Sequence, residues 1–473
     1  MTVLEIFYIV FCKNPYILWG VFVQYDKDIQ GIIFMKRIFL SAIFAVFVVG
    51  TVFSLHAKEV ATWWDKTDWS KPEVYPFDKN TLPFKASDSV KAIQIKGVDF
   101  NGKPTKFFCW YGVPEHKKGE TVPGIVLVHG GGGTAFSRWV ELWNSRGYAA
   151  IALDTCGNIP QHEWEVKKNK PQRNPEHAAT EAEKYKVGIP ESEQWSYQAI
   201  AEIMLAHSFL RSLDGVDTKR IGVTGVSWGG YLTTLVAGVD DRFAFAIPVY
   251  GCGFFRGTYF YQALRKRTRK LKNETDEEWS KRFDGLFGKW TKLWDANLFL
   301  SNAKMPVFFI NGTNDHFFYL DSWVKTARIP ANVYTALQVK MGHSHAQADV
   351  PAVRAFADMV TMNKSKLPRL VAEGVKDGVA YAEFESEEPV ISAFYNYSCD
   401  DCESTKRNWK TVKVKISGKG KVRVEQKVPE NAVLGYFNVV VKNNYSKEFG
   451  MARNYAKIPV FSSSYPLYYQ KNK

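Results

Sequence analysis

Between residues 124 and 362, short apolar runs alternate with longer amphipathic stretches, and this rhythm restricts the possible fold more than any other feature. Parallel strands buried on both faces give short apolar runs, and the helices that connect them give the amphipathic stretches. The runs at 123–129, 148–154, 220–225, 243–249 and 306–311 read as such strands. Apolar residues at helical spacing predict helices over 195–212 and 350–362. We therefore expect an α/β fold with a doubly wound, mostly parallel sheet.

The regions around this core differ in texture. Residues 90–113 alternate with period two and predict antiparallel edge strands. After Pro368 short β-type runs follow one another, with 417–420 as a hairpin turn, which predicts an antiparallel β-sandwich accessory domain over 368–473. The catalytic domain is then 58–367. Two stretches, 158–193 and 254–297, leave the carboxyl ends of strands and are interpreted as lids or substrate walls, with solvated loops as the alternative.

The N-terminal region has the pattern of an export signal. Lys36 and Arg37 precede an apolar run that ends at Leu55, and small Ala57 follows. We predict a signal peptide over 35–57 that is cut near Ala57, a secreted or periplasmic protein, and no stable membrane insertion after cleavage. An uncleaved anchor is the alternative. Met35 suggests that residues 1–34 come from a start codon assigned too early, although an N-terminal hydrophobic hairpin is a second interpretation.

Composition excludes several classes of protein. The chain has 473 residues, is 46% hydrophobic and carries a net charge of +14, so it is neither a disordered tail nor a disulfide-stapled miniprotein. The positive charge favours anionic partners, but no nucleic-acid-binding motif is present. Cys399 and Cys402 lack further metal ligands nearby, which favours a local disulfide over zinc. We expect no metal and no cofactor.

Residues 225–230 read Gly-Val-Ser-Trp-Gly-Gly and match G-x-S-x-G between a predicted strand and a predicted helix. A sharp turn at this junction lifts a serine hydroxyl above the sheet, and small neighbours are needed because the backbone is crowded there. The motif predicts Ser227 as a nucleophile.

Ser227 needs a base and an acid that follow it in the chain. Asp315 follows the buried strand at 306–311, and the histidines of the loop Gly342-His343-Ser344-His345 come after the next predicted strand. The order Ser, acid, His is that of a catalytic triad on separate strand ends. His343 and His345 are two residues apart and cannot both face the serine from an extended segment. We favour His345 as the base, with His343 as the alternative.

A glycine run supplies the fourth part of the predicted site. His129 is followed by Gly130, Gly131, Gly132 and Gly133 at the end of the first central strand. Glycines let a backbone N–H approach a substrate oxygen closely. We predict an oxyanion hole made by the N–H groups of Gly131 and Trp228.

Together these motifs resemble the α/β-hydrolase superfamily, in particular its acetylxylan esterase, dienelactone hydrolase and prolyl-oligopeptidase-like branch. The resemblance covers about 122–362. It implies Ser227 as nucleophile, Asp315 as orienting acid and a loop histidine as base. Asp154-Thr-Cys-Gly157 is similar to the Asp-Thr-Arg-Gly of bacterial acetylxylan esterases, with Cys156 in place of the arginine.

Export, positive charge and 15% aromatic residues are typical of an enzyme that acts on polysaccharides. We expect a carbohydrate esterase that removes O-acetyl or methyl ester groups from a xylan-like or pectin-like substrate. A prolyl-oligopeptidase-like serine peptidase is one alternative. A non-catalytic glycan-binding protein is the other.

Overall fold

The computed structural model describes residues 69–70, 72–163, 172–268, 270–442, 445 and 459–469. All of them belong to one compact unit, Glu59–Lys473. The predicted signal peptide and the segment before it lie outside the described residues, as does part of the first predicted lid. Among the helices of the described ranges, none is long and apolar enough to cross a membrane.

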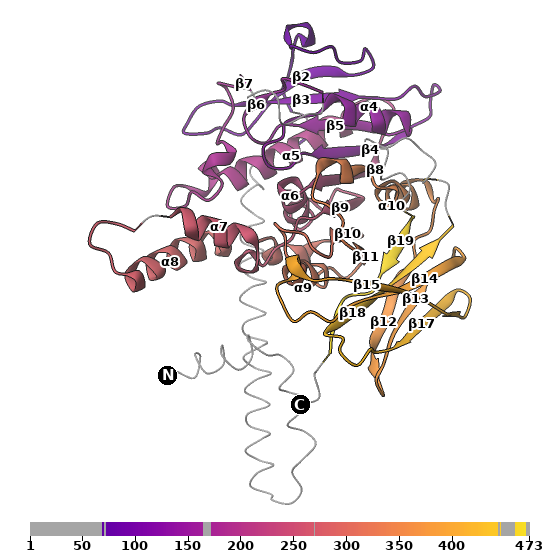
Figure 1. Cartoon of the computed structure of the whole chain (residues 1–473). Coiled ribbons are helices and arrows are strands. Elements are labelled where there is room, and N and C mark those ends of the chain that lie inside the picture. Colours follow the sequence, from indigo (N-terminus) through magenta and orange to yellow (C-terminus); the bar gives the residue numbers. More distant parts are fainter. Residues whose placement is uncertain are drawn as a thin grey trace, which may run out of the picture. The chain divides into compact units, whose positions relative to one another are not determined.

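A mixed sheet of nine strands forms the centre of this unit (Figure 1). The spatial order follows the chain order except that β5 lies between β3 and β4. From β5 through β4 to β11, all neighbouring strands are parallel. β1, β2 and β3 are antiparallel, as predicted for residues 90–113. In spatial order the strands are β1 (Val74–Pro76), β2 (Lys91–Lys96), β3 (Lys106–Gly112), β5 (Ala149–Leu153), β4 (Val122–Val128), β8 (Val216–Val226), β9 (Phe245–Val249), β10 (Val307–Gly312) and β11 (Val333–Gln338).

Several helices pack against the sheet, among them α4, α5, α6, α9 and α10. Two of them are buried on all sides: all nine residues of α6 are buried, and so are 16 of the 17 residues of α5. Pro351 occupies the first turn of α10, where its missing N–H costs no helical bond. The helices are α4 (Ser137–Ser145), α5 (Trp195–Arg211), α6 (Trp228–Val236), α7 (Tyr259–Arg267), α8 (Asp276–Trp294), α9 (Leu320–Ala327) and α10 (Pro351–Met362).

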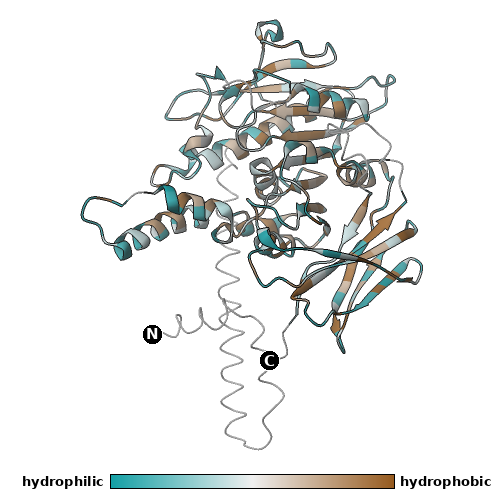
Figure 2. Cartoon of the chain, viewed as in Figure 1, coloured by the Kyte–Doolittle hydropathy of each residue, from teal (hydrophilic) through white to brown (hydrophobic). Residues whose placement is uncertain are grey.

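Two antiparallel sheets follow α10. One has the order β12 (Arg369–Lys376), β13 (Val379–Glu385), β17 (Lys421–Lys427) and β16 (Ile416–Ser417). The other has the order β15 (Lys410–Val414), β14 (Val390–Ser398), β18 (Leu434–Val441) and β19 (Phe461–Ser463), and β20 (Leu467–Tyr468) also pairs with β18. The predicted α/β class with C-terminal antiparallel sheets is confirmed. Figure 2 shows hydrophobic strands at the centre of the main sheet and more polar residues on α7 and α8.

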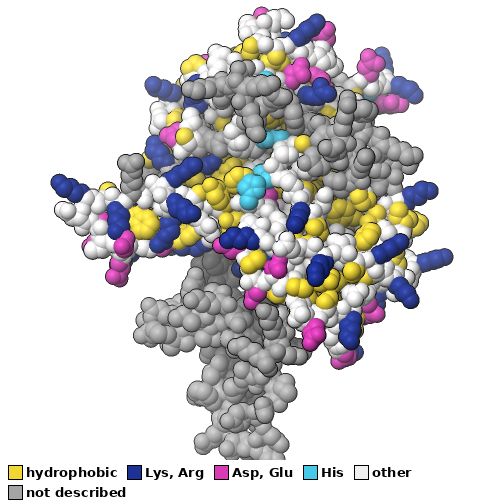
Figure 3. Space-filling view, in the orientation of Figure 1, with side chains coloured by type: hydrophobic (Ala, Val, Ile, Leu, Met, Phe, Trp, Pro, Cys, Tyr) yellow, Lys and Arg dark blue, Asp and Glu magenta, His cyan; other side chains and the backbone are white. Residues whose placement is uncertain are grey.

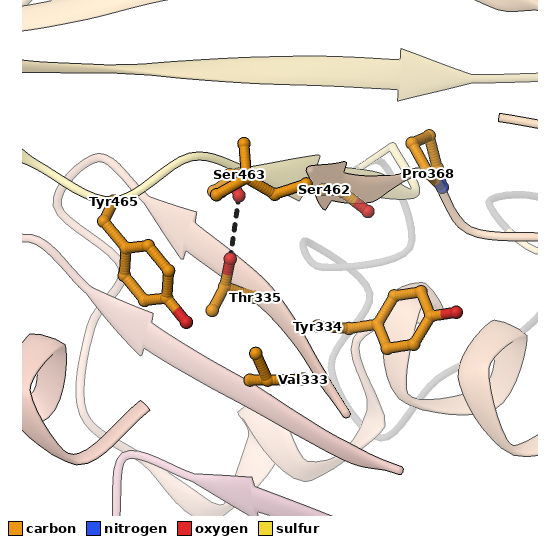
Figure 4. Close-up of a pocket in the computed structure, with 8 residues that line it drawn as sticks. Val333, Tyr334, Thr335, Pro368, Ser462, Ser463 and Tyr465 are labelled. Carbon is orange, nitrogen blue, oxygen red and sulfur yellow. Dashed lines mark hydrogen bonds between the residues drawn. The ribbon is translucent and has the colours of Figure 1, made fainter. Parts of the chain in front are cut away.

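The C-terminal sheets share a core with the main sheet. Along β18, Phe437 and Val439 belong to the small core of the C-terminal sheets, whereas Tyr436 and Val440 belong to the large core. This alternation follows from the two-residue period of a strand. Thr335 of β11 donates a hydrogen bond to the carbonyl of Ser463, 2.8 Å away. A small cavity of about 40 Å³ lies beside that bond (Figure 4) and is lined by Val333, Tyr334, Thr335, Pro368, Leu370, Ser462, Ser463 and Tyr465.

Short segments complete the described chain. β6 (Asn158–Ile159) and β7 (Gln172–Arg173) form a two-stranded ribbon. Turns of 3-10 helix lie at Lys79–Thr81, Glu181–Glu183, Glu191–Glu193, Phe255–Gly257, Ala296–Leu298, Leu300–Asn302, His345–Asp349 and Ser404–Lys406. None of the five cysteines in the described ranges forms a disulfide, so the predicted local disulfide between Cys399 and Cys402 is wrong.

Candidate active site

Ser227 lies in the turn between β8 and α6. Its backbone φ is +60° and its ψ is −115°, a conformation that residues other than glycine rarely adopt and that costs roughly 1–3 kcal/mol. The surrounding structure holds it there: the N–H of Ser227 donates to the carbonyl of Val249, 2.9 Å away, and its own carbonyl accepts from Tyr231. The strained turn presents the hydroxyl at the carboxyl edge of the sheet, as the motif predicts.

Close backbone contacts explain the glycines of this motif. A Cβ atom on Gly225 would lie 2.2 Å from the carbonyl oxygen of Gly229. A Cβ atom on Gly229 would lie 2.1 Å from the carbonyl oxygen of Val128 on the neighbouring strand. These two carbonyl oxygens belong to the buried backbone and cannot move aside for a side chain. Glycine at positions 225 and 229 therefore lets α6 begin this close to β4 and β8.

Asp315 lies in the loop after β10 and is 1% exposed. Its Oδ1 accepts hydrogen bonds from the backbone N–H groups of Phe317 and Phe318, at 2.9 and 2.7 Å. Its Oδ2 lies 2.5 Å from Nδ1 of His343. One carboxylate oxygen therefore fixes Asp315 to its own loop, and the other is directed at the histidine.

His343 stands between the acid and the serine. Its Nε2 lies 2.9 Å from Oγ of Ser227. A carboxylate only accepts hydrogen bonds, so Nδ1 carries the proton and Nε2 is left to accept from the serine hydroxyl. The ring stacks on Tyr250, with the ring centres 4.2 Å apart, and the Tyr250 hydroxyl donates to the carbonyl of Gly342 at 2.7 Å. Phe317 packs against the ring at 4.8 Å.

The prediction of His345 as the base is therefore wrong. Nε2 of His345 accepts the backbone N–H of Gly130 at 2.8 Å, and its ring packs edge-on against Phe136. Burial lowers the pKa of His345 to about 3, and the nearby rings of His129 and His343 act in the same direction. His345 is thus a neutral hydrogen-bond acceptor for the glycine loop. His343 and His345 thus face different partners. Their spacing in the sequence showed that only one of them could face Ser227, but not which one.

The two predicted oxyanion donors are the N–H groups of Gly131, in the loop after β4, and of Trp228, which directly follows Ser227. Trp228 is the first residue of α6, where a backbone N–H has no partner within the helix. Within the described ranges neither its N–H nor that of Gly131 donates to a protein acceptor, whereas the N–H of Gly130 donates to His345. Gly130 also accepts from Nδ1 of His129 at 2.8 Å, which fixes the start of the glycine loop. The oxyanion role of Gly131 and Trp228 stays a prediction.

The two predicted insertions meet at Trp228. The second forms α7 and α8 rather than irregular loops, and α8 begins with a capping box at Thr275. Trp290 of α8 donates its indole N–H to the carbonyl of Lys184, 2.7 Å away, in the first insertion. The Lys184 ammonium lies 4.0 Å from the ring centre of Trp228, within the range of a cation–π contact. A role as lid or substrate wall stays a prediction.

Sequence reasoning missed three residues that hold the acid and the base: Tyr250, Phe317 and Asn314. Asn314 had the clearest signal, because it directly precedes Asp315. No sequence motif marks Tyr250 or Phe317. Both contact the ring of His343 because the fold brings their loops together. In the described part of the chain no group of three or more His, Cys, Asp or Glu residues is arranged to hold a metal ion.

The chain matches two family models. Residues 55–267 match the model described as acetyl xylan esterase, and residues 185–360 match the prolyl oligopeptidase family. The first match contains the glycine loop and Ser227, and the second contains Ser227, Asp315 and His343. The overlap of the two matches contains Ser227 and the helix that follows it.

Solved structures similar to this chain include enzymes of both kinds. The acetyl xylan esterase from Paenibacillus sp. R4 is 20% identical, with 65% of this chain and 93% of that chain covered and a TM-score of 0.45. Acetyl xylan esterase 1 from Thermoanaerobacterium sp. is 13% identical, with 62% and 88% covered and a TM-score of 0.45. The acylaminoacyl peptidase of Pyrococcus horikoshii is 20% identical, with 63% and 45% covered and a TM-score of 0.41, so this chain spans less than half of it. The family matches make this chain similar to the acetyl xylan esterases over 55–267 and to the prolyl oligopeptidase family over 185–360, and both matched segments contain the elbow at Ser227.

Proposed function

We propose that this protein is an exported esterase that removes O-acetyl groups from a polysaccharide, with Ser227 as nucleophile, His343 as base and Asp315 as orienting acid. The observation that carries the proposal is the continuous relay from Asp315 through His343 to Ser227, with contacts of 2.5 and 2.9 Å. Such a relay raises the nucleophilicity of a serine that is a poor nucleophile on its own.

The relay defines the steps of the reaction. Nε2 of His343 takes the proton of Ser227 as Oγ attacks the ester carbonyl, and Asp315 stabilises the imidazolium that forms. The N–H groups of Gly131 and Trp228 donate to the oxyanion, and loss of one such donor costs roughly 2.7–4 kcal/mol. The imidazolium then protonates the sugar oxygen, which leaves as the alcohol. Water, deprotonated by His343, attacks the acetyl-serine and releases acetate and the free enzyme.

The surface of the molecule supports a carbohydrate substrate. Figure 3 shows histidine and hydrophobic side chains on one face of the molecule, with Lys and Arg side chains spread over the same face. Aromatic faces stack on sugar rings, and basic side chains pair with the carboxylates of uronic acids. Lys184, close to Trp228, and the net charge of +14 favour a glycan that contains acidic sugars, such as acetylated pectin or glucuronoxylan. Methyl ester hydrolysis on the same sugars is the alternative reaction.

The test is the release of acetate and methanol from acetylated xylan, acetylated pectin and methylated pectin. We expect acetate from the wild-type chain and from Ser145→Ala, a matched change at an exposed serine, and none from Ser227→Ala. Methanol without acetate would make the protein a uronate methylesterase. Release of neither product from any of the glycans would overturn the carbohydrate proposal.

A serine peptidase is the second candidate, because the prolyl oligopeptidase match contains all three residues of the relay. Peptides with internal proline and N-acylated peptides are the substrates to include in the same assay. Peptide cleavage that depends on Ser227, without acetate release, would assign this second function.

Export is a separate part of the proposal and rests on the predicted signal peptide at 35–57. Intact-mass measurement of protein recovered outside the cytoplasm should give a chain that begins near Lys58. Recovery of the full-length chain in the membrane fraction would favour the uncleaved anchor instead.

A further inference from the structure

A loop of the C-terminal sheets holds the loop that carries Asp315. The side-chain amide of Asn314 lies within hydrogen-bond distance of three backbone carbonyls, those of Ser404, Thr405 and Arg407, at 3.2, 3.2 and 2.8 Å. These residues form the turn between β14 and β15. Asn314 directly precedes Asp315, so the C-terminal sheets contact the acid loop one residue from the acid.

The same asparagine is linked to the loop that carries His343. Its Oδ1 accepts the hydroxyl of Thr313 at 2.7 Å, and the Thr313 oxygen in turn accepts the backbone N–H of Lys340 at 3.0 Å. Lys340 lies in the turn between β11 and His343, with a φ of +51°. The side chains of Thr313 and Asn314 therefore join the C-terminal loop, the acid loop and the base loop in one hydrogen-bonded chain.

A second set of contacts fixes the C-terminal loop itself. Arg407 is 6% exposed and donates to the hydroxyl of Tyr468 at 3.3 Å, with the guanidinium 5.6 Å from the ring centre. The hydroxyl of Tyr468 donates to the carboxylate of Asp321 in the first turn of α9. The segment from Asp315 to α9 is thus held at both of its ends from the C-terminal sheets.

We propose that the C-terminal sheets are a positioning element of the active site, and that Asn314 is the residue through which they act. The proposal rests on the function proposed above, in which Asp315 orients His343. Oδ1 of Asp315 is bonded to Phe317 and Phe318 within its own loop, so the carboxylate moves when the loop moves. A loop released from the C-terminal carbonyls carries Oδ2 away from Nδ1 of His343, and displacements of about 1 Å can reduce catalysis by about 100-fold.

The experiment compares three variants of the full chain. Asn314→Ala removes the donor to the three carbonyls, and Arg407→Ala leaves Asn314 in place but loosens its acceptors. The matched control is Ser463→Ala, which removes another contact between the same two regions, the hydrogen bond from the N–H of Leu337 to Oγ of Ser463, away from the acid loop. His316 and His345, the other histidines beside His343, stay unchanged in all three.

The readouts separate positioning from mere folding. For ester hydrolysis we expect Asn314→Ala to lower kcat about 10- to 100-fold with KM within about twofold, because Asn314 does not touch substrate. Arg407→Ala should lower kcat in the same direction by a smaller factor, and Ser463→Ala should keep the wild-type kcat and KM.

An alkyl fluorophosphonate keeps this inference distinguishable from the proposed function. It reacts with an activated serine and contains no sugar, so its rate of reaction with Ser227 measures the relay and the oxyanion donors without any glycan, and Asn314→Ala changes only the former. Failure of the wild-type chain to label at Ser227 would overturn the proposed function. A labelled wild type and an Asn314→Ala variant of equal rate would overturn the positioning role alone. If Asn314→Ala does not fold, Arg407→Ala decides by the same comparison.

Discussion

The proposed nucleophile, Ser227, and the proposed acid, Asp315, are held in position in different ways. Ser227 is fixed by contacts within 25 residues of itself and by the adjacent β4, all inside the parallel sheet. The loop of Asp315 is fixed partly by carbonyls 90 to 93 residues beyond Asn314, in the C-terminal sheets. A short motif can therefore determine the position of the serine. The acid and the base depend on parts of the chain that no local motif describes.

The largest effect should come from Ser227→Ala. This variant tests the role of the residue that is held in place by nearby contacts. We expect kcat to fall by about 10⁶-fold, because the group that attacks the ester is gone. The thermal unfolding temperature should stay within a few degrees of wild type. Steady-state ester hydrolysis and circular dichroism check both expectations, and residual activity within about 100-fold of wild type would exclude Ser227 as nucleophile.

The two histidines of the base loop should differ nearly as strongly. His343→Ala removes the group that contacts both Asp315 and Ser227, so kcat should fall by about 10⁵- to 10⁶-fold. His345→Gln keeps an acceptor for the N–H of Gly130 and should retain activity within about tenfold. Measured in the same assay, the opposite order of effects would restore His345 as the base.

A smaller loss is expected at the acid. Asp315→Asn keeps the shape of the side chain but turns an acceptor into a possible donor towards Nδ1 of His343, which favours the wrong tautomer and lowers kcat by about 10⁴-fold. Comparison with Asn314→Ala then shows how much of this loss comes from misplacement alone. An Asp315→Asn variant of wild-type kcat would contradict the assignment of the acid.

The smallest effect concerns stability against pH. The pKa of His345 is lowered in the fold to about 3, from an ordinary value of 6.5. Between these values the unfolded chain binds a proton that the folded chain does not, so the free energy of unfolding decreases as pH falls, by up to about 1.4 kcal/mol per pH unit. The dependence should be shallower in His345→Gln.

Urea unfolding at pH 4, 5, 6 and 7 measures this difference. Asp295, whose pKa burial raises to about 6, has the opposite slope, but it is present in both chains and cancels in the comparison. Identical pH slopes for the two chains would show that His345 is not held neutral by the fold.

Much of the fold follows from local pattern. The buried strands at 123–129, 220–225 and 306–311 are observed as β4, β8 and β10 within a few residues, because apolar β runs between helices have few other ways to be buried. Ser227 was equally predictable, because its glycines are required by backbone contacts that belong to the motif itself.

The choice of histidine was not predictable for a physical reason. His343 and His345 share one loop, and contacts with distant parts of the chain decide which ring faces Ser227: His343 pairs with Asp315, whereas His345 accepts from Gly130. Tyr250, from the end of β9, then fixes the ring of His343 by stacking. The core that the C-terminal sheets share with the main sheet was not predictable either. The sequence of β18 does not show that one face of the strand packs in the large core and the other in the small core.

The contact between Tyr468 and Asp321 has a consequence for the order of events during synthesis. The two residues are 147 positions apart. At about 5–20 residues per second, roughly 7 to 30 s pass between translation of α9 and translation of the tyrosine that secures it. The elbow of Ser227 can be complete early in that interval, whereas the acid loop waits for its distant anchor. A nascent chain would therefore carry a formed nucleophile before it carries a fully aligned relay, and full hydrolytic power would be among the last properties the enzyme acquires.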